Sequence, residues 1–217
     1  MSSTEYGHEE RALMLEVVRA TIREGLAHGR PLRVDPAEFP EHLQHERACF
    51  VTLNRHGQLR GCIGHLEPIQ PLIADVAENA FAAAFRDPRF PPLQAHETRG
   101  LALHISVLGE PEPIAFADEE DLLRQLRPGI DGLILEAPGG HRGTFLPSVW
   151  EQLPDRRAFL THLKLKAGLP ADYRDPRLRA WRYTTESFAA PFRSSSSSTA
   201  SAASRSVSTR KDRWISR

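Results

Sequence analysis

The chain has 217 residues, of which 40% are hydrophobic and 26% charged, as expected of one globular domain with elaborations. Its formal charge is zero, but the segment from Arg193 onward holds six basic residues and one acidic residue, so residues 1–192 carry 22 basic and 27 acidic side chains, a balance that argues against nucleic-acid binding. We expect a soluble, cytoplasmic protein for three reasons. The chain has only two cysteines, it begins with no secretory signal, and no apolar run approaches the roughly 18 residues that cross a membrane.

The first third of the chain predicts a helix, a linker and a hairpin. Apolar residues recur at three- and four-residue steps over residues 9–28, which is typical of an amphipathic helix, and residues 1–8 before it are expected to be flexible. Prolines mark a linker over residues 31–40. Residues 48–53 and 59–64 then read as two strands around a type I turn with a bulge at Gly57. That turn places Cys49 and Cys62 on opposite faces of the hairpin, whereas a one-residue change of register would make them neighbours.

The rest of the chain alternates helices with hairpins. Leu72–Phe85 is apolar nearly all round, which indicates a buried helix. The further elements expected are a strand (100–108), a short helix capped by Asp118 (118–126), a hairpin (131–136 and 143–146), two helices (148–153 and 155–167) and a last strand (181–188). This order favours an α+β fold, with a mostly antiparallel sheet and packed helices. The domain spans residues 9–192, and the Ser-rich composition of residues 193–217 predicts a disordered tail.

The strongest functional signal is the motif Leu59-Arg60-Gly61-Cys62-Ile63-Gly64. Glycines weaken strands, so two of them around a cysteine indicate a bulge or a close approach of backbone or ligand. Alternation along a strand predicts that Leu59 and Ile63 face the core while Arg60 and Cys62 share the other face. A guanidinium beside a thiol lowers the pKa of the thiol, so Cys62 and Arg60 are the predicted catalytic pair. The alternative is that Cys62 is a small buried hydrophobe.

A thiol nucleophile needs a base, and four histidines are available. His65 follows the motif closely, His104 shares a strand face with Ser106, and His141 and His162 lie further along the chain. No set of residues with zinc-ligand spacing and no nucleotide-binding motif is present, so neither a metal nor a cofactor is expected.

A polar stripe on the helix Leu72–Phe85 and the loop after it form a second group of interest. Asp75, Asn79 and Arg86 fall on one side of the helix, and Asp87-Pro88-Arg89-Phe90-Pro91-Pro92 comes next. Arginines and an aspartate between prolines either hold an anionic ligand or tie the loop down.

Taken together, these segments resemble the AMMECR-domain family. The motif at residues 59–64, the Asp87–Pro92 segment and four further stretches fall in order over roughly residues 10–190: Ser106-Val107-Leu108, Asp131–Glu136, Arg142–Pro147 and Trp181-Arg182-Tyr183-Thr184. The resemblance implies a larger subdomain with a mostly antiparallel sheet, a smaller subdomain, and the glycine-cysteine motif near the cleft between them. The positions carried over are Arg60, Gly61, Cys62, Gly64, Asp87, Arg89, Ser106 and Thr144.

What the resemblance implies about activity is limited. It supplies no reaction, but it indicates a bacterial protein of the type that accompanies a Memo-like protein and a radical S-adenosylmethionine enzyme. Cys62 and Arg60 are then the catalytic candidates, and Gly61, Gly64, Asp87, Arg89, Ser106 and Thr144 are expected to bind substrate. His65 is also assigned to substrate binding, although this position more often holds a small hydroxyl residue in the family. The alternative function is a non-catalytic module that binds a small molecule or another protein in the same cleft.

Overall fold

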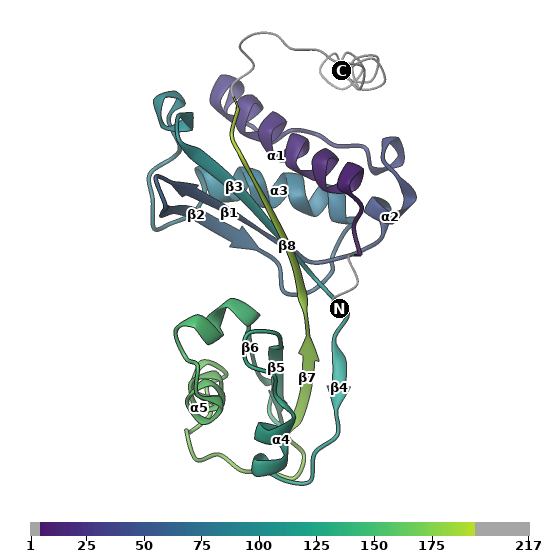
Figure 1. The fold of residues 1–217 in the computed structure, drawn as a ribbon, viewed down its shortest axis with the longest axis vertical. Coiled ribbons are helices and arrows are strands. Elements are labelled where there is room, and N and C mark those ends of the chain that lie inside the picture. The colour runs from purple at the N-terminus through teal and green to yellow at the C-terminus, as the bar shows by residue number, and fades with distance from the viewer. Residues whose placement is uncertain (1–4, 194–217) are drawn as a thin grey trace.

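The computed structural model describes residues 5–193, which form two units, each built on a four-stranded antiparallel sheet. The units are stacked along the long axis of the molecule (Figure 1). Two extended crossings connect them, one entering the second unit through β4 (Glu112–Ile114) and one returning from β7 (Arg179–Tyr183) to β8 (Thr185–Pro191). The α+β class is confirmed. Residues 194–217, most of the predicted tail, lie outside the described residues.

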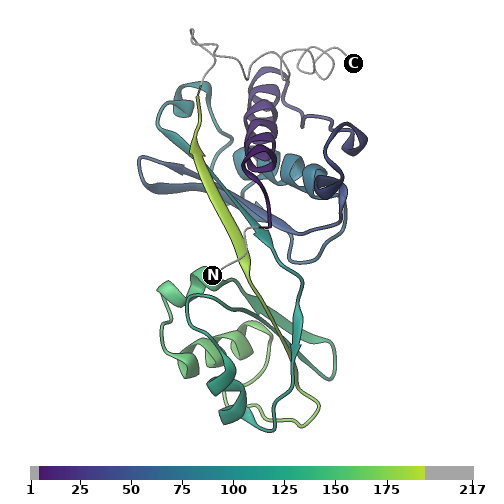
Figure 2. The ribbon, with the colours of Figure 1, turned by 45° about the vertical axis from the view of Figure 1, so that its right-hand side comes forward.

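The larger unit carries helices on one face of its sheet, which has the strand order β2-β1-β3-β8. Helices α1 and α3 lie on the same side of the sheet and cross each other, as Figures 1 and 2 show together. The elements of this unit besides β8 are α1 (His8–His28), η1 (Pro36–Glu38), α2 (Glu41–Gln44), β1 (Cys49–Arg55), β2 (Gln58–Gly64), α3 (Leu72–Phe85), η2 (Ala95–Thr98) and β3 (Leu101–Leu108). On the opposite face of the sheet, no helix of this unit lies among residues 5–193.

The smaller unit has the strand order β4-β7-β5-β6. Its elements besides β4 and β7 are α4 (Glu119–Gln125), β5 (Gly132–Ala137), β6 (His141–Phe145), η3 (Pro147–Glu151) and α5 (Arg156–Lys166). In its core the rings of Trp150 and Phe159 stack with centroids 3.7 Å apart. Asp118 and Asp155 cap α4 and α5 by accepting hydrogen bonds from the first turns, as aspartates at this position do.

A small apolar cluster joins the two units. Ala48, just before β1, and Phe50, in β1, pack with Ile134 of β5 and with Trp181 and Tyr183 of β7. The chain passes from one sheet to the other at Thr184, so the single strand expected over residues 181–188 is two strands in different sheets. Periodicity along the chain does not reveal a change of sheet, because both strands keep the extended conformation.

Two long helices form where the sequence predicts them. The helix expected over residues 9–28 is α1, and the buried helix is α3 with the predicted bounds. The segment before α1 is packed where it is described: the Tyr6 side chain is fully buried, and Glu186 accepts hydrogen bonds from the backbone N–H groups of Glu5 and Tyr6. Tyr6, which lies within residues 1–8 that were expected to be flexible, contributes to the core.

The first hairpin differs from its prediction in its turn. His56 and Gly57 both have positive φ, 51° and 79°, and Arg55 pairs with Gln58. These are the features of a two-residue type I′ turn, in which the twist of the turn matches that of the strands. The bulge is not at Gly57 but at Arg60, because Leu53 pairs with Gly61 and Asn54 pairs with Leu59.

None of the helices within residues 5–193 combines the length and apolarity needed to cross a membrane.

Candidate functional site

The bulge at Arg60 reverses the predicted orientation of the first half of the motif. An unpaired residue breaks the alternation of side chains, so Leu59 is 43% exposed while Arg60 is 8% exposed. Cys62, which pairs with Thr52, lies on the open side of the sheet. The prediction that Leu59 joins the core and that Arg60 shares a face with Cys62 is therefore wrong. Cys49 and Cys62 lie on opposite faces, as the hairpin predicted, and both are free thiols.

Arg60 is bound by a carboxylate instead of standing beside the thiol. Its Nε and Nη2 donate to the two carboxylate oxygens of Glu97 at 2.8 and 2.9 Å, and Nη2 also donates to the carbonyl oxygen of Pro91 at 2.9 Å. This guanidinium lowers the pKa of Glu97 to about 2. Arg60 thus fastens the loop that leads into η2 to the edge of the sheet, and its predicted catalytic role has no support in this geometry.

Asp87 and Arg89 hold the backbone of Cys62. Strand β2 is at the edge of its sheet, so the groups of Cys62 that point away from β1 need partners elsewhere. Asp87 accepts a hydrogen bond from the Cys62 N–H at 2.9 Å, and Arg89 Nη2 donates to the Cys62 carbonyl oxygen at 3.0 Å. Arg89 Nη2 also donates to Asp87 at 2.7 Å and, with further N–H donors, holds the pKa of this buried carboxyl well below its usual range. The ion pair therefore continues the sheet edge and fixes the position of Cys62.

The Cys62 side chain lies in a row of polar groups on the open face. The Thr52 hydroxyl donates to Cys62 Sγ at 3.2 Å, and His104 lies on the other side of Thr52, as its cross-strand partner in β3. Burial lowers the pKa of His104, which keeps its imidazole neutral at neutral pH. Arg89 is the arginine that interacts with the thiol, and Arg60 is not. The pKa of Arg89 is raised mainly by Asp87 and, to a smaller extent, by Cys62. The thiol therefore lies within reach of one guanidinium and one hydroxyl.

Ser106 lies in the next row of the same face. Its hydroxyl is 2.8 Å from that of Ser187 on β8, and its other neighbour across the sheet is Phe50 on β1. The predicted site residue Ser106 is thus on the thiol face but in contact with a second serine instead of with Cys62.

His65 turns to the opposite side of β2, toward α3. Its Nδ1 lies 2.5 Å from Oδ1 of Asp75, a carboxylate that is 1% exposed. Asp75 also accepts hydrogen bonds from the Cys49 N–H, the Cys49 thiol and Asn79. Burial, followed by this carboxylate, raises the pKa of Cys49. The polar stripe predicted on this helix therefore splits, since Asp75 and Asn79 point inward while Arg86 is exposed.

The other predicted substrate-binding residues have structural roles. A Cβ atom on Gly61 would collide with the backbone carbonyl of Ala83 in α3, and one on Gly64 would collide with Phe50 and the Cys49 carbonyl. The close approach that the glycines predict is thus of backbone, not of ligand. The Thr144 hydroxyl is buried and lies 3.1 Å from the Tyr183 hydroxyl, which donates to the carbonyl oxygen of Phe145.

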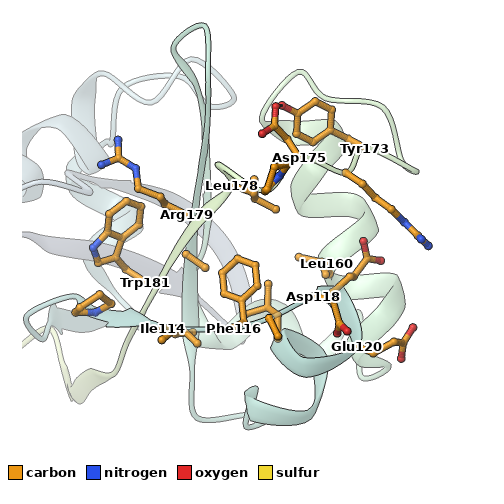
Figure 3. A pocket seen from close by; sticks show the side chains of 18 residues that line it. Ile114, Phe116, Asp118, Glu120, Leu160, Tyr173, Asp175, Leu178, Arg179 and Trp181 are labelled. Carbon is orange, nitrogen blue, oxygen red and sulfur yellow. The ribbon is translucent and has the colours of Figure 1, made fainter.

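Among the cavities of the described residues that lie away from the thiol, two are of interest. One, of about 710 Å³, is in the smaller unit between β4, α4 and the segment before β7 (Figure 3). Phe116, Leu160 and Leu178 form apolar walls there, with carboxylates such as Asp118 and Asp175 around them. None of the predicted site residues lines it. The other, of about 410 Å³, lies between the two units and is lined by His65 and Thr144, among others.

Three residues that the structure places at these sites were not predicted. Thr52, Glu97 and Lys166 contact the thiol, the Arg60 guanidinium and the carbonyl of Thr144 respectively. Thr52 could have been found from the register of the hairpin, since it is the residue that pairs with Cys62. Nothing local marks Glu97, which is 37 residues from Arg60 in sequence.

Comparison with known proteins settles the family. The family model described as AMMECR1 matches residues 15–188. The chain belongs to the AMMECR1 family. A protein of Methanothermobacter thermautotrophicus is 39% identical over 182 residues, covering 83% of this chain and 94% of the relative. Protein MJ0810 of Methanocaldococcus jannaschii is 40% identical over 167 residues, covering 76% of this chain and 81% of its own.

A solved structure shares the AMMECR1 fold seen here. The crystal structure of the uncharacterized protein PH0010 from Pyrococcus horikoshii matches with a TM-score of 0.74 at 34% identity, and it covers 86% of this chain and 94% of that one. These three relatives come from archaea, and none of their names states an activity. Membership of the AMMECR1 family therefore establishes the fold of this chain and leaves its chemistry to be argued from the site.

Proposed function

We propose that this AMMECR1-family protein is a thiol-dependent enzyme whose nucleophile is Cys62. The observation that carries the proposal is the way the cysteine is held. Its backbone N–H and carbonyl are both bound by the Asp87–Arg89 pair, while its side chain stays partly exposed on the open face of the sheet. Any residue on an edge strand needs partners for such groups, but here one ion pair supplies both and also fixes the position of a partly exposed thiol, as a reactive group requires.

The neighbours of the thiol suit this chemistry. A guanidinium and a hydroxyl donor beside a sulfur can stabilise the negative charge that develops on the reacting atoms in a transition state. Arg89 and Thr52 supply these groups, in place of the predicted Arg60. The imidazole of His104 lies in the same row, on the far side of Thr52, and is proposed to contact the substrate, while the proton of the partly exposed thiol passes to water. Ser106 and Ser187 offer hydroxyls to a substrate that lies along the face.

Alkylation of the two cysteines tests the proposal. We expect iodoacetamide to modify Cys62 at pH 7 at least about tenfold faster than Cys49, which is fully buried and whose pKa burial raises. Arg89→Gln and Thr52→Val should each slow the modification of Cys62. Arg60→Gln is the matched control, because its guanidinium faces Glu97, and should leave the rate unchanged in folded protein. If Cys62 reacts as slowly as Cys49 across pH 6–9, Cys62 is not a nucleophile.

A second candidate function is a non-catalytic binding module that uses the same face. The observation in its favour is that the hydrogen bond to the Cys62 thiol comes from Thr52, and no imidazole or carboxylate within residues 5–193 is hydrogen-bonded to it. Mass spectrometry of small molecules that co-purify with the wild type and with Cys62→Ala separates the two. A ligand retained equally by both proteins supports a binding module, whereas a mass added covalently to Cys62 supports the enzyme.

We also propose the partners that the family resemblance implies, a Memo-like protein and a radical S-adenosylmethionine enzyme, in the cytoplasm. Two free cysteines suit a reducing compartment. The bacterial subtype rests on the motifs alone, since the relatives from Methanothermobacter and Methanocaldococcus are archaeal. Affinity purification of the tagged protein from its own cells, compared with an untagged strain, tests the partnership, and recovery of neither enzyme would count against it.

A further inference from the structure

The cavity between the two units has the size of a small-molecule site. It measures about 410 Å³, within the usual range for ligand pockets, and its walls come from the loop after β2 and from β5, β6 and α5. His65 lines it, and this residue points away from the open face that carries Cys62. The cavity is therefore separate from the thiol site, and a ligand bound in it does not depend on the function proposed for Cys62.

A histidine is presented to the cavity by a buried carboxylate. Nδ1 of His65 bonds to Asp75, while Nε2 has no hydrogen-bond partner among residues 5–193. Asp75 is itself fixed by N–H groups of Cys49, Gln70 and Asn79. A carboxylate that bonds to Nδ1 fixes the orientation of the imidazole and leaves Nε2 as the ring nitrogen available to a ligand. The side chain of His65 is 31% exposed, so a ligand can reach that nitrogen.

Cationic groups predominate around the same cavity. Lys166 donates one hydrogen bond, to the Thr144 carbonyl oxygen at 2.9 Å, and an ammonium group has two further donors. Arg142 also lines the cavity and is paired with Glu67, the acidic residue of the lining. Because Glu67 is already paired, Lys166 and His65 are the groups left to contact an anion.

Apolar side chains complete the walls. Leu66 and Ile69, in the loop that connects β2 to α3, are 41% and 59% exposed, among the most exposed large apolar residues within the described part of the chain. Ile134, on β5, also lines the cavity. Exposed apolar residues gathered beside donors are typical of a site that binds a molecule with a polar end and an apolar body.

We propose that this pocket binds a small amphipathic anion, a carboxylate or phosphate ester, with its head group on His65 and Lys166 and its apolar body against Leu66 and Ile69. Carboxylates and phosphates share the acceptor oxygens that the Lys166 ammonium requires.

Titration calorimetry at pH 7 with octanoate, octyl phosphate, 1-octanol and inorganic phosphate tests the proposal on the full chain. We expect at least one amphipathic anion to bind at least about tenfold more tightly than either octanol or inorganic phosphate, since one charged hydrogen bond has that effect. The tighter of the two anions identifies the head group. His65→Gln and Lys166→Gln should each weaken its binding about tenfold. The matched control is His162→Gln, because His162 is an exposed histidine of α5 bonded to its own helix, and this variant should bind like the wild type.

Three results overturn the proposal. The first is that octanol binds as tightly as the anions, and the second is that neither anion binds. The third is that an anion binds but neither His65→Gln nor Lys166→Gln weakens its binding, because the ligand would then lie in another apolar cavity. Thermal unfolding of each variant shows whether it folds. Lys166 is exposed, so Lys166→Gln keeps the test valid even if the loss of the His65–Asp75 hydrogen bond destabilises the other variant.

Discussion

Replacing Glu97 by Gln should remove the ion pair that holds the loop before η2 against the edge of the first sheet. Glu97 is bound by Arg60 through two hydrogen bonds, and both side chains are largely buried, with exposed fractions of 14% and 10%. The substitution keeps the shape of the side chain and removes its charge. The loss of stability therefore reports on the ion pair more than on packing.

The magnitude can be worked out from the pKa of Glu97. Arg60 and the Gln94 N–H lower it from 4.5 to about 2, and each pH unit corresponds to about 1.4 kcal/mol, so the ionised carboxylate stabilises the fold by about 3 kcal/mol. Because the folded-state pKa is the lower one, this stability is fully present above pH 4.5 and is lost as the pH falls toward 2. Glu97→Gln should therefore be less stable than the wild type by about 3 kcal/mol at pH 7, and the difference should shrink steadily below pH 4.5.

Urea unfolding followed by tryptophan fluorescence, from pH 7 to pH 3, measures this difference. The control is Glu24→Gln, which removes a surface ion pair with the exposed Arg30 and should change stability by less than about 1 kcal/mol. Arg60→Gln should destabilise the protein about as much as Glu97→Gln without slowing Cys62 alkylation. Unchanged stability in Glu97→Gln, or a difference that does not depend on pH, would refute the assignment of Arg60 to a structural clamp.

Three further substitutions test the packing around the motif. Gly61→Ala should destabilise the protein by about 3 kcal/mol or more, because the new methyl group meets the α3 backbone, and equal urea midpoints for variant and wild type would contradict this. Asp87→Asn should cost about 2 kcal/mol and speed hydrogen exchange at the Cys62 amide, which NMR can follow; slow exchange in the variant would mean that another group covers the sheet edge. Phe81→Ala should cost about 3–5 kcal/mol, since Phe81 is buried against Phe85 with ring centroids 5.0 Å apart, and a thermal midpoint like that of the wild type would show that the ring contributes little to the core.

The sequence by itself determined the elements whose signals are local. The apolar surface of Leu72–Phe85 predicted a buried helix, and the recurrence of apolar residues in α1 predicted an amphipathic one. The glycines around Cys62 correctly indicated a close approach of backbone. These features depend on residues within one or two turns of each other, or on the absence of a side chain, so a single segment is enough to reveal them.

The tertiary structure alone decided how the motif is used. One bulged residue turned Arg60 from the thiol face to Glu97, because a carboxylate 37 residues away and the edge of the sheet offered the guanidinium an ion pair. A separation of 27 residues likewise hid the role of Arg89, which lies beside Cys62 because the loop after α3 returns to strand β2. His65 bonds to Asp75 because α3, which carries Asp75, packs against the first hairpin. Side chains pair with groups that lie close to them in space. Which groups are close depends on how the sheet and helices pack, and the spacing of residues along the chain contains no information on that packing.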